Sequence, residues 1–131
     1  MTSQLIIKDL WGSWEIQILG AKYEKIDCIW ALFGFWSFDI GWIVPIVPEI
    51  GDLTVGGLVM GGGIESTSHK YGLWQNICLR YNLVLADGTI TSCTRDEDSD
   101  LFYAIPWSYG TLGFLTAVDI MIVPFKVRIL S

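Results

Sequence analysis

Residues 52–88, DLTVGGLVMGGGIESTSHKYGLWQNICLRYNLVLADG, decide the fold of this 131-residue chain. Asp52 or Thr54 is a suitable N-cap for a short helix over residues 55–60, because each side chain carries an oxygen that accepts from backbone amides. The three glycines at 61–63 are expected to end that helix. The first part of the stretch therefore predicts a loop and a short helix rather than a central strand.

The second part of the same stretch predicts a β-hairpin. Apolar and polar side chains alternate over residues 77–86, which is typical of a strand with one buried face. Asp87 and Gly88 are expected to take the two positive-φ positions of a type I′ turn. Residues 89–93 then return as the partner strand.

The sequence after the hairpin adds one helix and one long strand. Asp98 or Ser99 is a suitable N-cap for a helix over residues 100–105. Residues 112–123 are rich in β-forming side chains, and Pro124 is expected to end their pairing because it lacks a backbone donor. The fold class predicted from the whole pattern is α+β, without an internal repeat.

Residues 1–39 have no sustained periodicity and form an unassigned N-terminal segment, whereas residues 40–131 are assigned to one domain. Residues 29–47 are apolar apart from Ser37 and Asp39. A membrane span is one interpretation, but a carboxylate near its middle is costly in lipid, so buried strand and loop are favoured. Association with a membrane is left open.

Charge and cysteine spacing exclude several functions. The formal net charge of −6 argues against a nucleic-acid ligand, because phosphate backbones bind basic surfaces. Cys28, Cys78 and Cys93 are far apart and the chain has one histidine, so the sequence predicts neither a disulfide framework nor a metal site. A hydrophobic fraction of 52% favours a partner that covers part of the surface.

The glycine cluster is the main candidate for ligand binding. It lacks the third glycine of a dinucleotide fingerprint, and no Gly-Lys-Ser/Thr of a nucleotide phosphate loop follows it. Backbone amides without Cβ shielding, followed by Ser66, Ser68 and His69, suit a ligand rich in carbonyl, ring-nitrogen and phosphate groups. Close backbone packing is the alternative. His69 could be a structural hydrogen-bonding residue or a ligand contact, and no catalytic residue is assigned.

An ordered series of motifs resembles the vanillyl-alcohol-oxidase type of FAD-binding family. The series is TVGG (54–57), ESTSHKYG (65–72), LVLADG (83–88) and DSDLFYAIPWSYGTLGFLTAVDIMIVP (98–124). The match starts near Ile40 and covers roughly two thirds of the chain. The resemblance implies a partial FAD-binding domain, mainly the second of two α+β subdomains that enclose the flavin.

The resemblance also implies which residues lie near FAD. One group is the start of the predicted helix with the loop after it, a second lies on the approach to the flavin, and a third forms a late turn. The implied cofactor-binding residues are Thr54, Gly56, Gly57, Gly61, Gly63, Ser66, Ser68, His69, Tyr71 and Gly72, then Pro45, Val47 and Pro48, then Gly110, Thr111, Leu112 and Gly113.

Within that family, the motifs resemble those of its sterol-reducing enzymes. They imply that NADPH reduces FAD and that the reduced flavin reduces the Delta24 side-chain double bond of a sterol, at the endoplasmic reticulum membrane facing the cytosol. The diphosphate loop of the first subdomain and the substrate domain are not recognisable here. We therefore expect a fragment or variant that is inactive alone, and cytoplasmic if free. The alternatives are another FAD-linked oxidase or dehydrogenase of the same fold, and a non-catalytic truncated chain.

Overall fold

A computed structural model describes residues 4–8, 13–18, 21–26, 42–50 and 53–124 of the chain. Six antiparallel strands form one sheet in the order β3-β2-β1-β7-β5-β6, and β4 pairs with β8 separately. The strands are β1 (Gln4–Lys8), β2 (Ser13–Ile18), β3 (Ala21–Ile26), β4 (Trp42–Ile43), β5 (Cys78–Val84), β6 (Ile90–Thr94), β7 (Phe114–Met121) and β8 (Val123–Pro124). The helices are α2 (Val55–Gly61), α3 (Ser68–Tyr71), the 3₁₀ helix η1 (Trp74–Ile77) and α4 (Ser99–Ala104). The α+β class is confirmed.

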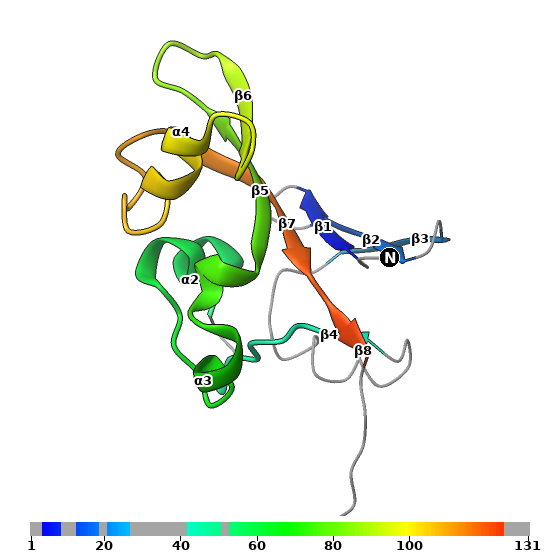
Figure 1. Ribbon diagram of the computed structural model, residues 1–131. Coiled ribbons are helices and arrows are strands. Elements are labelled where there is room, and N and C mark those ends of the chain that lie inside the picture. The colour runs from blue at the N-terminus through cyan, green and yellow to red at the C-terminus, as the bar shows by residue number, and fades with distance from the viewer. Residues whose placement is uncertain (1–3, 9–12, 19–20, 27–41, 51–52, 125–131) are drawn as a thin grey trace, which may run out of the picture.

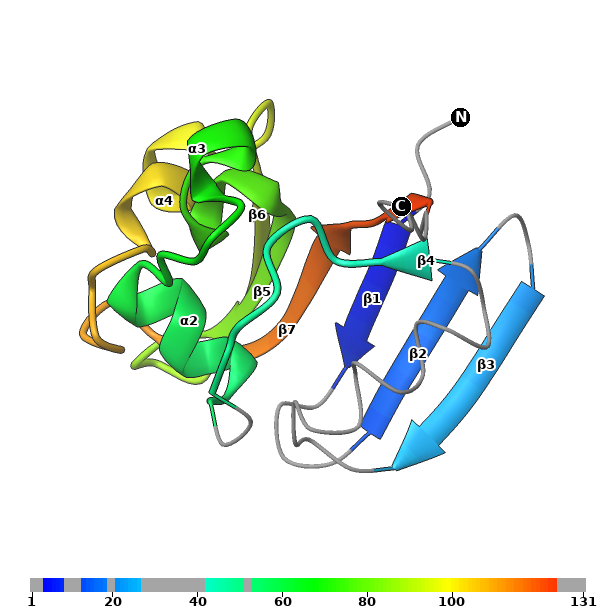
Figure 2. The ribbon, with the colours of Figure 1, turned by 90° about the horizontal axis from the view of Figure 1, so that it is seen from below.

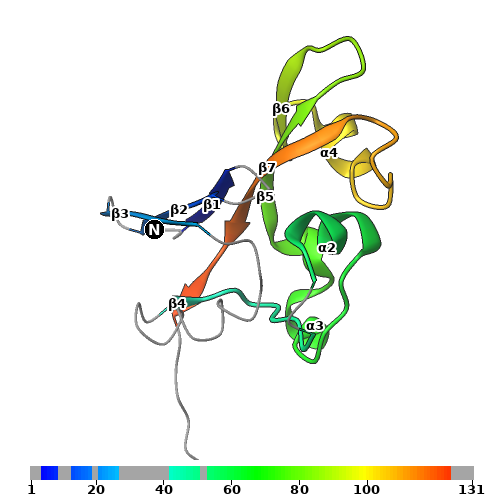
Figure 3. The ribbon, with the colours of Figure 1, turned by 180° about the vertical axis from the view of Figure 1, so that it is seen from behind.

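The helices and the N-terminal strands lie on opposite sides of the β5–β7 ladder (Figures 1 and 3). β7 is the central strand of this arrangement, because it pairs with β5 along one edge and with β1 along the other. The sequence patterns left residues 1–39 unassigned, so β1–β3 are elements that sequence reasoning missed. Residues 29–41 of the apolar stretch at residues 29–47 lie outside the described residues.

The prediction of a loop leading into a short helix is confirmed in α2. The Thr54 hydroxyl accepts a hydrogen bond from the Gly57 amide at 3.1 Å, so Thr54 is the N-cap. Gly62 ends the helix with φ of 72°, a left-handed conformation that favours glycine. The buried face of α2 consists of Val55, Leu58 and Val59.

The antiparallel hairpin is confirmed, but its predicted turn type is wrong. Gly88 has φ of 84°, whereas Asp87 is not among the residues with positive φ, so only one of the two left-handed positions of a type I′ turn is present here. The Leu85 amide instead donates to the Thr89 carbonyl across a three-residue loop, and the Gly88 amide donates to the Leu85 carbonyl. This is a three-residue hairpin loop with one left-handed glycine, in which the Asp87 side chain accepts from the Thr89 amide at 2.9 Å.

The helix and strand predicted downstream are also present, with two differences. Asp98 occupies the N-cap position of α4, but its side chain makes no capping hydrogen bond and its φ is 52°. The predicted β run is divided at Ile122 into β7 and β8. Pro124 lies opposite Trp42 in that short ladder, and the residues after it lie outside the described part of the chain, so an end of pairing at Pro124 stays a prediction.

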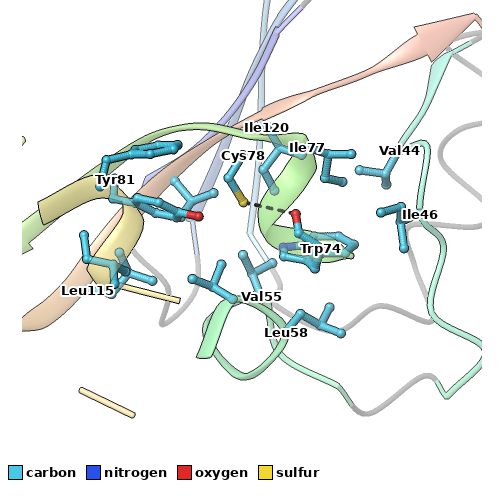
Figure 4. Packing of buried hydrophobic residues seen from close by; sticks show 14 of the residues in the cluster. Val44, Ile46, Val55, Leu58, Trp74, Ile77, Cys78, Tyr81, Leu115 and Ile120 are labelled. Carbon is cyan, nitrogen blue, oxygen red and sulfur yellow. Dashed lines mark hydrogen bonds between the residues drawn. The ribbon is translucent and has the colours of Figure 1, made fainter. Parts of the chain in front are cut away.

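The core lies between the helices and the inner face of β5 and β7. Figure 4 shows Cys78 between Tyr81 and Trp74, with Val55 and Leu58 reaching in from α2. The Cys78 thiol donates to the Trp74 carbonyl oxygen at 3.4 Å. Burial raises the pKa of the Cys78 thiol to about 12, and it raises the pKa of the Tyr81 hydroxyl as well.

This core predicts a loss of stability in alkali. Burial also raises the pKa of Cys93 to about 11. The pKa of a thiol in an unfolded chain is about 8.5. Above that pH, the unfolded chain loses thiol protons that the folded chain still holds. The free energy of unfolding therefore falls as the pH rises from about 8.5 toward the raised pKa values of Cys78 and Cys93. Tyr81 acts in the same direction above about pH 10. Urea unfolding at pH 8 and pH 10 should show a lower midpoint at pH 10.

The matched control is Cys78→Ala, which should reduce this dependence on pH by removing one buried thiol. In a Cys28→Ser background, the two buried thiols should also react slowly with a disulfide reagent at pH 8 while the chain is folded. Reaction as fast as that of a free thiol would show that Cys78 and Cys93 are not protected.

Candidate functional site

A groove of about 590 Å³ lies where α2, the end of β5 and the turn before β7 meet. This volume falls within the range of about 300–1,000 Å³ that small-molecule sites occupy. In Figure 2 the loop after α4 runs beside α2 at the same end of the molecule. The groove is lined by Thr54, Gly56, Met60, Val84, Leu85, Ala86, Gly110, Thr111, Leu112, Gly113, Phe114 and Leu115.

Strand pairing brings the two sides of the groove together. Val84 at the end of β5 pairs with Phe114 at the start of β7, so the turn before β7 lies beside the end of β5. Gly113 makes the closest approach, because a Cβ added there would lie 3.0 Å from the Val84 carbonyl oxygen. The position of residues 110–113 thus follows from a close backbone contact.

Two threonine hydroxyls give the groove complementary hydrogen-bonding capacity. Thr54 accepts from the Gly57 amide, so its hydroxyl proton is still available to donate to a ligand oxygen. Thr111 donates to the Ser108 carbonyl at 2.7 Å, so its oxygen can still accept from a ligand N–H or O–H. The groove can therefore orient a ligand that carries both donors and acceptors.

The remainder of the groove is largely apolar. Leu112 is 41% exposed and Phe114 is 56% exposed, so two large apolar side chains in the lining face water. A flat ring system placed against them would remove apolar surface from water. Among the described residues, no lining side chain is ionisable, so this lining offers hydrogen bonds and apolar surface but no acid or base.

The structure brings together six of the residues implied to be near FAD. They come from the predicted helix start and from the late turn, and they are Thr54, Gly56, Gly110, Thr111, Leu112 and Gly113. Gly57 and Gly61 are exposed on α2 outside the groove lining. Gly63 packs against the core, since a Cβ there would lie 2.6 Å from Leu58 Cδ2.

The other implied residues form a second group around α3. The Thr67 hydroxyl donates to the Pro45 carbonyl at 2.8 Å and thereby joins residues 45–48 to the loop before α3. His69 Nδ1 lies 2.9 Å from the Ser66 carbonyl oxygen, and the Ser68 hydroxyl accepts from the Glu65 amide at 2.9 Å. This group also contains Val47, Pro48, Tyr71 and Gly72, none of which lines the groove. For these residues, cofactor contact stays a prediction.

Sequence reasoning did not assign six of the lining residues. They are Met60, Val84, Leu85, Ala86, Phe114 and Leu115. The sequence patterns predicted both the first hairpin strand and the later strand, but not that they pair with each other. Because β5 pairs antiparallel with β7, the end of β5 lies beside the start of β7 and forms one side of the groove.

No group of three or more metal-ligating side chains occurs in the described ranges. Every helix in these ranges is too short or too polar to span a bilayer. Most of the apolar stretch at residues 29–47 lies outside them.

Known proteins show the same fold and a closely similar sequence. Residues 36–94 match the family described as an FAD binding domain. The structure of 6-hydroxy-D-nicotine oxidase from Arthrobacter nicotinovorans superposes with a TM-score of 0.66 at 22% identity, covering 92% of this chain and 24% of that chain. The chain thus carries part of an FAD-binding domain of the vanillyl-alcohol-oxidase type, as its sequence predicted.

Within that class, the sequence of the chain is closely similar to those of sterol reductases. The chain is 67% identical to Delta(24)-sterol reductase from Homo sapiens over 88 residues, which are 67% of this chain and 17% of that enzyme. It is 52% identical to the enzyme of the same name from Pisum sativum over 84 residues, 63% of this chain and 15% of that enzyme. The resemblance stated from the motifs is confirmed. The chain spans less than a fifth of the length of these relatives.

The N-cap at the edge of the groove can be tested by substitution. Thr54→Ala removes the acceptor for the Gly57 amide and should destabilise the chain by about 1 kcal/mol in urea unfolding. Thr54→Ser keeps a hydroxyl at the same position and should retain most of that stability. Equal stability of the alanine and serine variants would show that the capping bond contributes nothing.

Proposed function

We propose that this chain forms one wall of the FAD site of a flavin-dependent sterol reductase. The observation that carries the proposal is the groove, in which the TVGG segment and the GTLG turn meet around a volume suited to a ligand. The family match at residues 36–94 and the 67% identity to a Delta(24)-sterol reductase support FAD as the ligand and oxidoreduction as the chemistry.

The lining fits part of a flavin cofactor. Thr54 has a hydroxyl proton for a carbonyl or phosphate oxygen, and Thr111 has an acceptor for an N–H or O–H group. Leu112 and Phe114 offer apolar surface to a planar ring. In this proposal the chain binds and orients FAD, which supplies the hydride-transfer chemistry when bound.

The proposed overall reaction is reduction of the Delta24 double bond of a sterol, with NADPH as the source of hydride. One hydride and one proton add across the double bond, and NADP⁺ is released. No ionisable side chain in the described part of the chain lines the groove, so the proposal assigns no proton donor to this lining. We place the proposed enzyme at the endoplasmic reticulum membrane, with further subdomains of the same protein completing the flavin site.

Binding of FAD can be mapped on the chain by amide chemical shifts. Adding FAD should shift the amides of Thr54, Gly56 and residues 110–113, and should leave those of Ser66 and His69 nearly unchanged. One wall leaves much of the cofactor in water, so we expect a Kd weaker than about 1 μM, corresponding to less than about 8 kcal/mol of binding free energy. Riboflavin and AMP, titrated separately, will show which part of FAD the groove prefers.

Two results would count against this assignment of the groove. Shifts confined to the region around α3 would place FAD on the second group of residues instead. No saturable shift at any site, up to millimolar FAD, would remove the groove as a flavin-binding surface.

The sterol-reductase assignment is tested in a complete enzyme. Replacing the matching 88-residue segment of human Delta(24)-sterol reductase with that of this chain should preserve FAD content and reduction of a Delta24 sterol, measured by mass spectrometry. The control is the same chimera carrying Gly113→Leu, which places a side chain against the Val84 carbonyl and should lower FAD content. A folded chimera that holds FAD but reduces no sterol would favour another FAD-linked oxidoreductase.

A further inference from the structure

We propose that Trp107 is a positioning residue for the groove, because its indole packs on Gly62 at the end of α2 and fixes the turn that carries residues 110–113. Trp107 does not line the groove itself. Its effect on a ligand therefore passes through the turn. The part of this inference that concerns FAD rests on the proposed function.

The contact between Trp107 and Gly62 is unusually close. A Cβ added to Gly62 would lie 2.1 Å from Trp107 Cζ2 and 2.3 Å from Cη2, distances at which a real carbon does not fit. The indole thus occupies the space that a side chain at position 62 would need. A glycine is therefore needed at position 62 for two reasons. Its φ of 72° ends the helix, and the absence of a side chain lets the indole ring pack against its Cα.

A second contact joins the same two elements. The Ser108 hydroxyl lies 3.4 Å from the Met60 sulfur, as a donor to it. Met60 lines the groove, and Ser108 is the residue directly after Trp107. The last turn of α2 is therefore joined to the loop by the indole on Gly62 and by the hydroxyl on Met60.

The backbone of the loop requires such support. Trp107 has φ of 70° and Tyr109 has φ of 51°, although bulky residues rarely adopt positive φ. Strained residues of this kind persist only where surrounding contacts hold them. Inside the loop, the Ser108 amide donates to the Ile105 carbonyl at 3.1 Å and the Thr111 amide to the Ser108 carbonyl at 3.0 Å. The contacts with α2 are the ones that fix this strained turn relative to Thr54 and Gly56.

The half-exposed state of Trp107 separates this role from ordinary core packing. The side chain is 50% exposed, whereas Trp74 in the core is fully buried. Trp107 therefore contributes less buried surface than a core tryptophan and keeps one face in solvent. Its contact with Gly62 aligns two surface segments that form opposite sides of the groove.

Gly62→Ala is the sharpest test, and Gly88→Ala is its matched control. Both glycines have left-handed φ, 72° and 84°, so both substitutions impose the same kind of backbone strain. Only Gly62→Ala places a methyl group in the indole, because nothing lies within 4 Å of a Cβ at Gly88. Trp107→Ala tests the same contact by removing the ring, and Trp107→Phe restores an aromatic ring.

Two measurements on the full 131-residue chain separate the positioning role from FAD binding. Without FAD, amide hydrogen exchange over residues 107–113 should become faster in Gly62→Ala and Trp107→Ala, and should stay unchanged in Gly88→Ala. With FAD, Gly62→Ala should bind at least about 5-fold more weakly, the lower limit expected when a methyl group overpacks a close contact. Trp107→Ala should also bind more weakly, because the turn loses its support, and in both variants the FAD-induced shifts at residues 110–113 should decrease more than the shift at Thr54. Trp107→Phe should recover most of the affinity.

The Gly62→Ala and Trp107→Ala effects should not add in the double variant, because both act on one contact. If the parent chain shows no FAD shifts, the proposed function fails, whatever the exchange rates are. If the parent chain binds FAD but Gly62→Ala and Trp107→Ala behave as Gly88→Ala does, Trp107 has no positioning role. Should Gly62→Ala fail to fold, Trp107→Ala and Trp107→Phe decide the question alone.

Discussion

The antiparallel pairing of β5 with β7 is the interaction on which the described structure depends. It joins residues that lie 30 to 42 positions apart in the sequence, from Val84 opposite Phe114 to Cys78 opposite Ile120. The inner face of this ladder carries Tyr81, Leu83 and Val118, and the helices cover it. The same pairing ends beside the groove, so the register that buries the core also places residues 110–113 next to the end of β5. A one-residue slip would turn the core side chains to the other face, and it would also move the Val84 carbonyl away from Gly113.

Local chemistry explains which parts of this fold could be predicted from the sequence. The helix at residues 55–60 has a hydroxyl cap before it and glycines after it, and the hairpin has strict alternation with an Asp-Gly pair, so each carries its own signals. The turn type was wrong because Asp-Gly is common both in two-residue type I′ loops and in three-residue loops with one left-handed glycine. The Leu85–Thr89 backbone bond, rather than the identity of the turn residues, selects the second form.

The strands β1–β3 were missed for a different reason. Polar and apolar residues alternate in β2 (SWEIQI), but this signal is only six residues long, and β1 (QLIIK) and β3 (AKYEKI) do not alternate clearly. What makes β1 a strand is the edge of β7, to which it pairs from Gln4 opposite Met121 to Lys8 opposite Ala117. The lining of the groove also depends on pairing between distant segments. Its polar and glycine residues were recognisable as motifs, whereas Val84, Leu85 and Phe114 became part of the lining only because β5 pairs with β7. Motif resemblance suggested residues near a cofactor, and pairing selected which of them lie together.

The glycines illustrate why a glycine-rich motif is an incomplete guide to a binding site. A Cβ at Gly63 would clash with Leu58, one at Gly62 would clash with Trp107, and one at Gly113 would lie against the Val84 carbonyl oxygen. At these three positions a glycine is needed because other atoms of this chain occupy the space that a side chain would take. Packing and ligand binding were alternatives at the level of sequence, but in the structure they are connected. The close contacts at Gly62 and Gly113 hold the turn on α2 and on β5 respectively, and the space left between those two attachments is the groove. The motif therefore sets the geometry of the groove through contacts within the protein, before any ligand is bound.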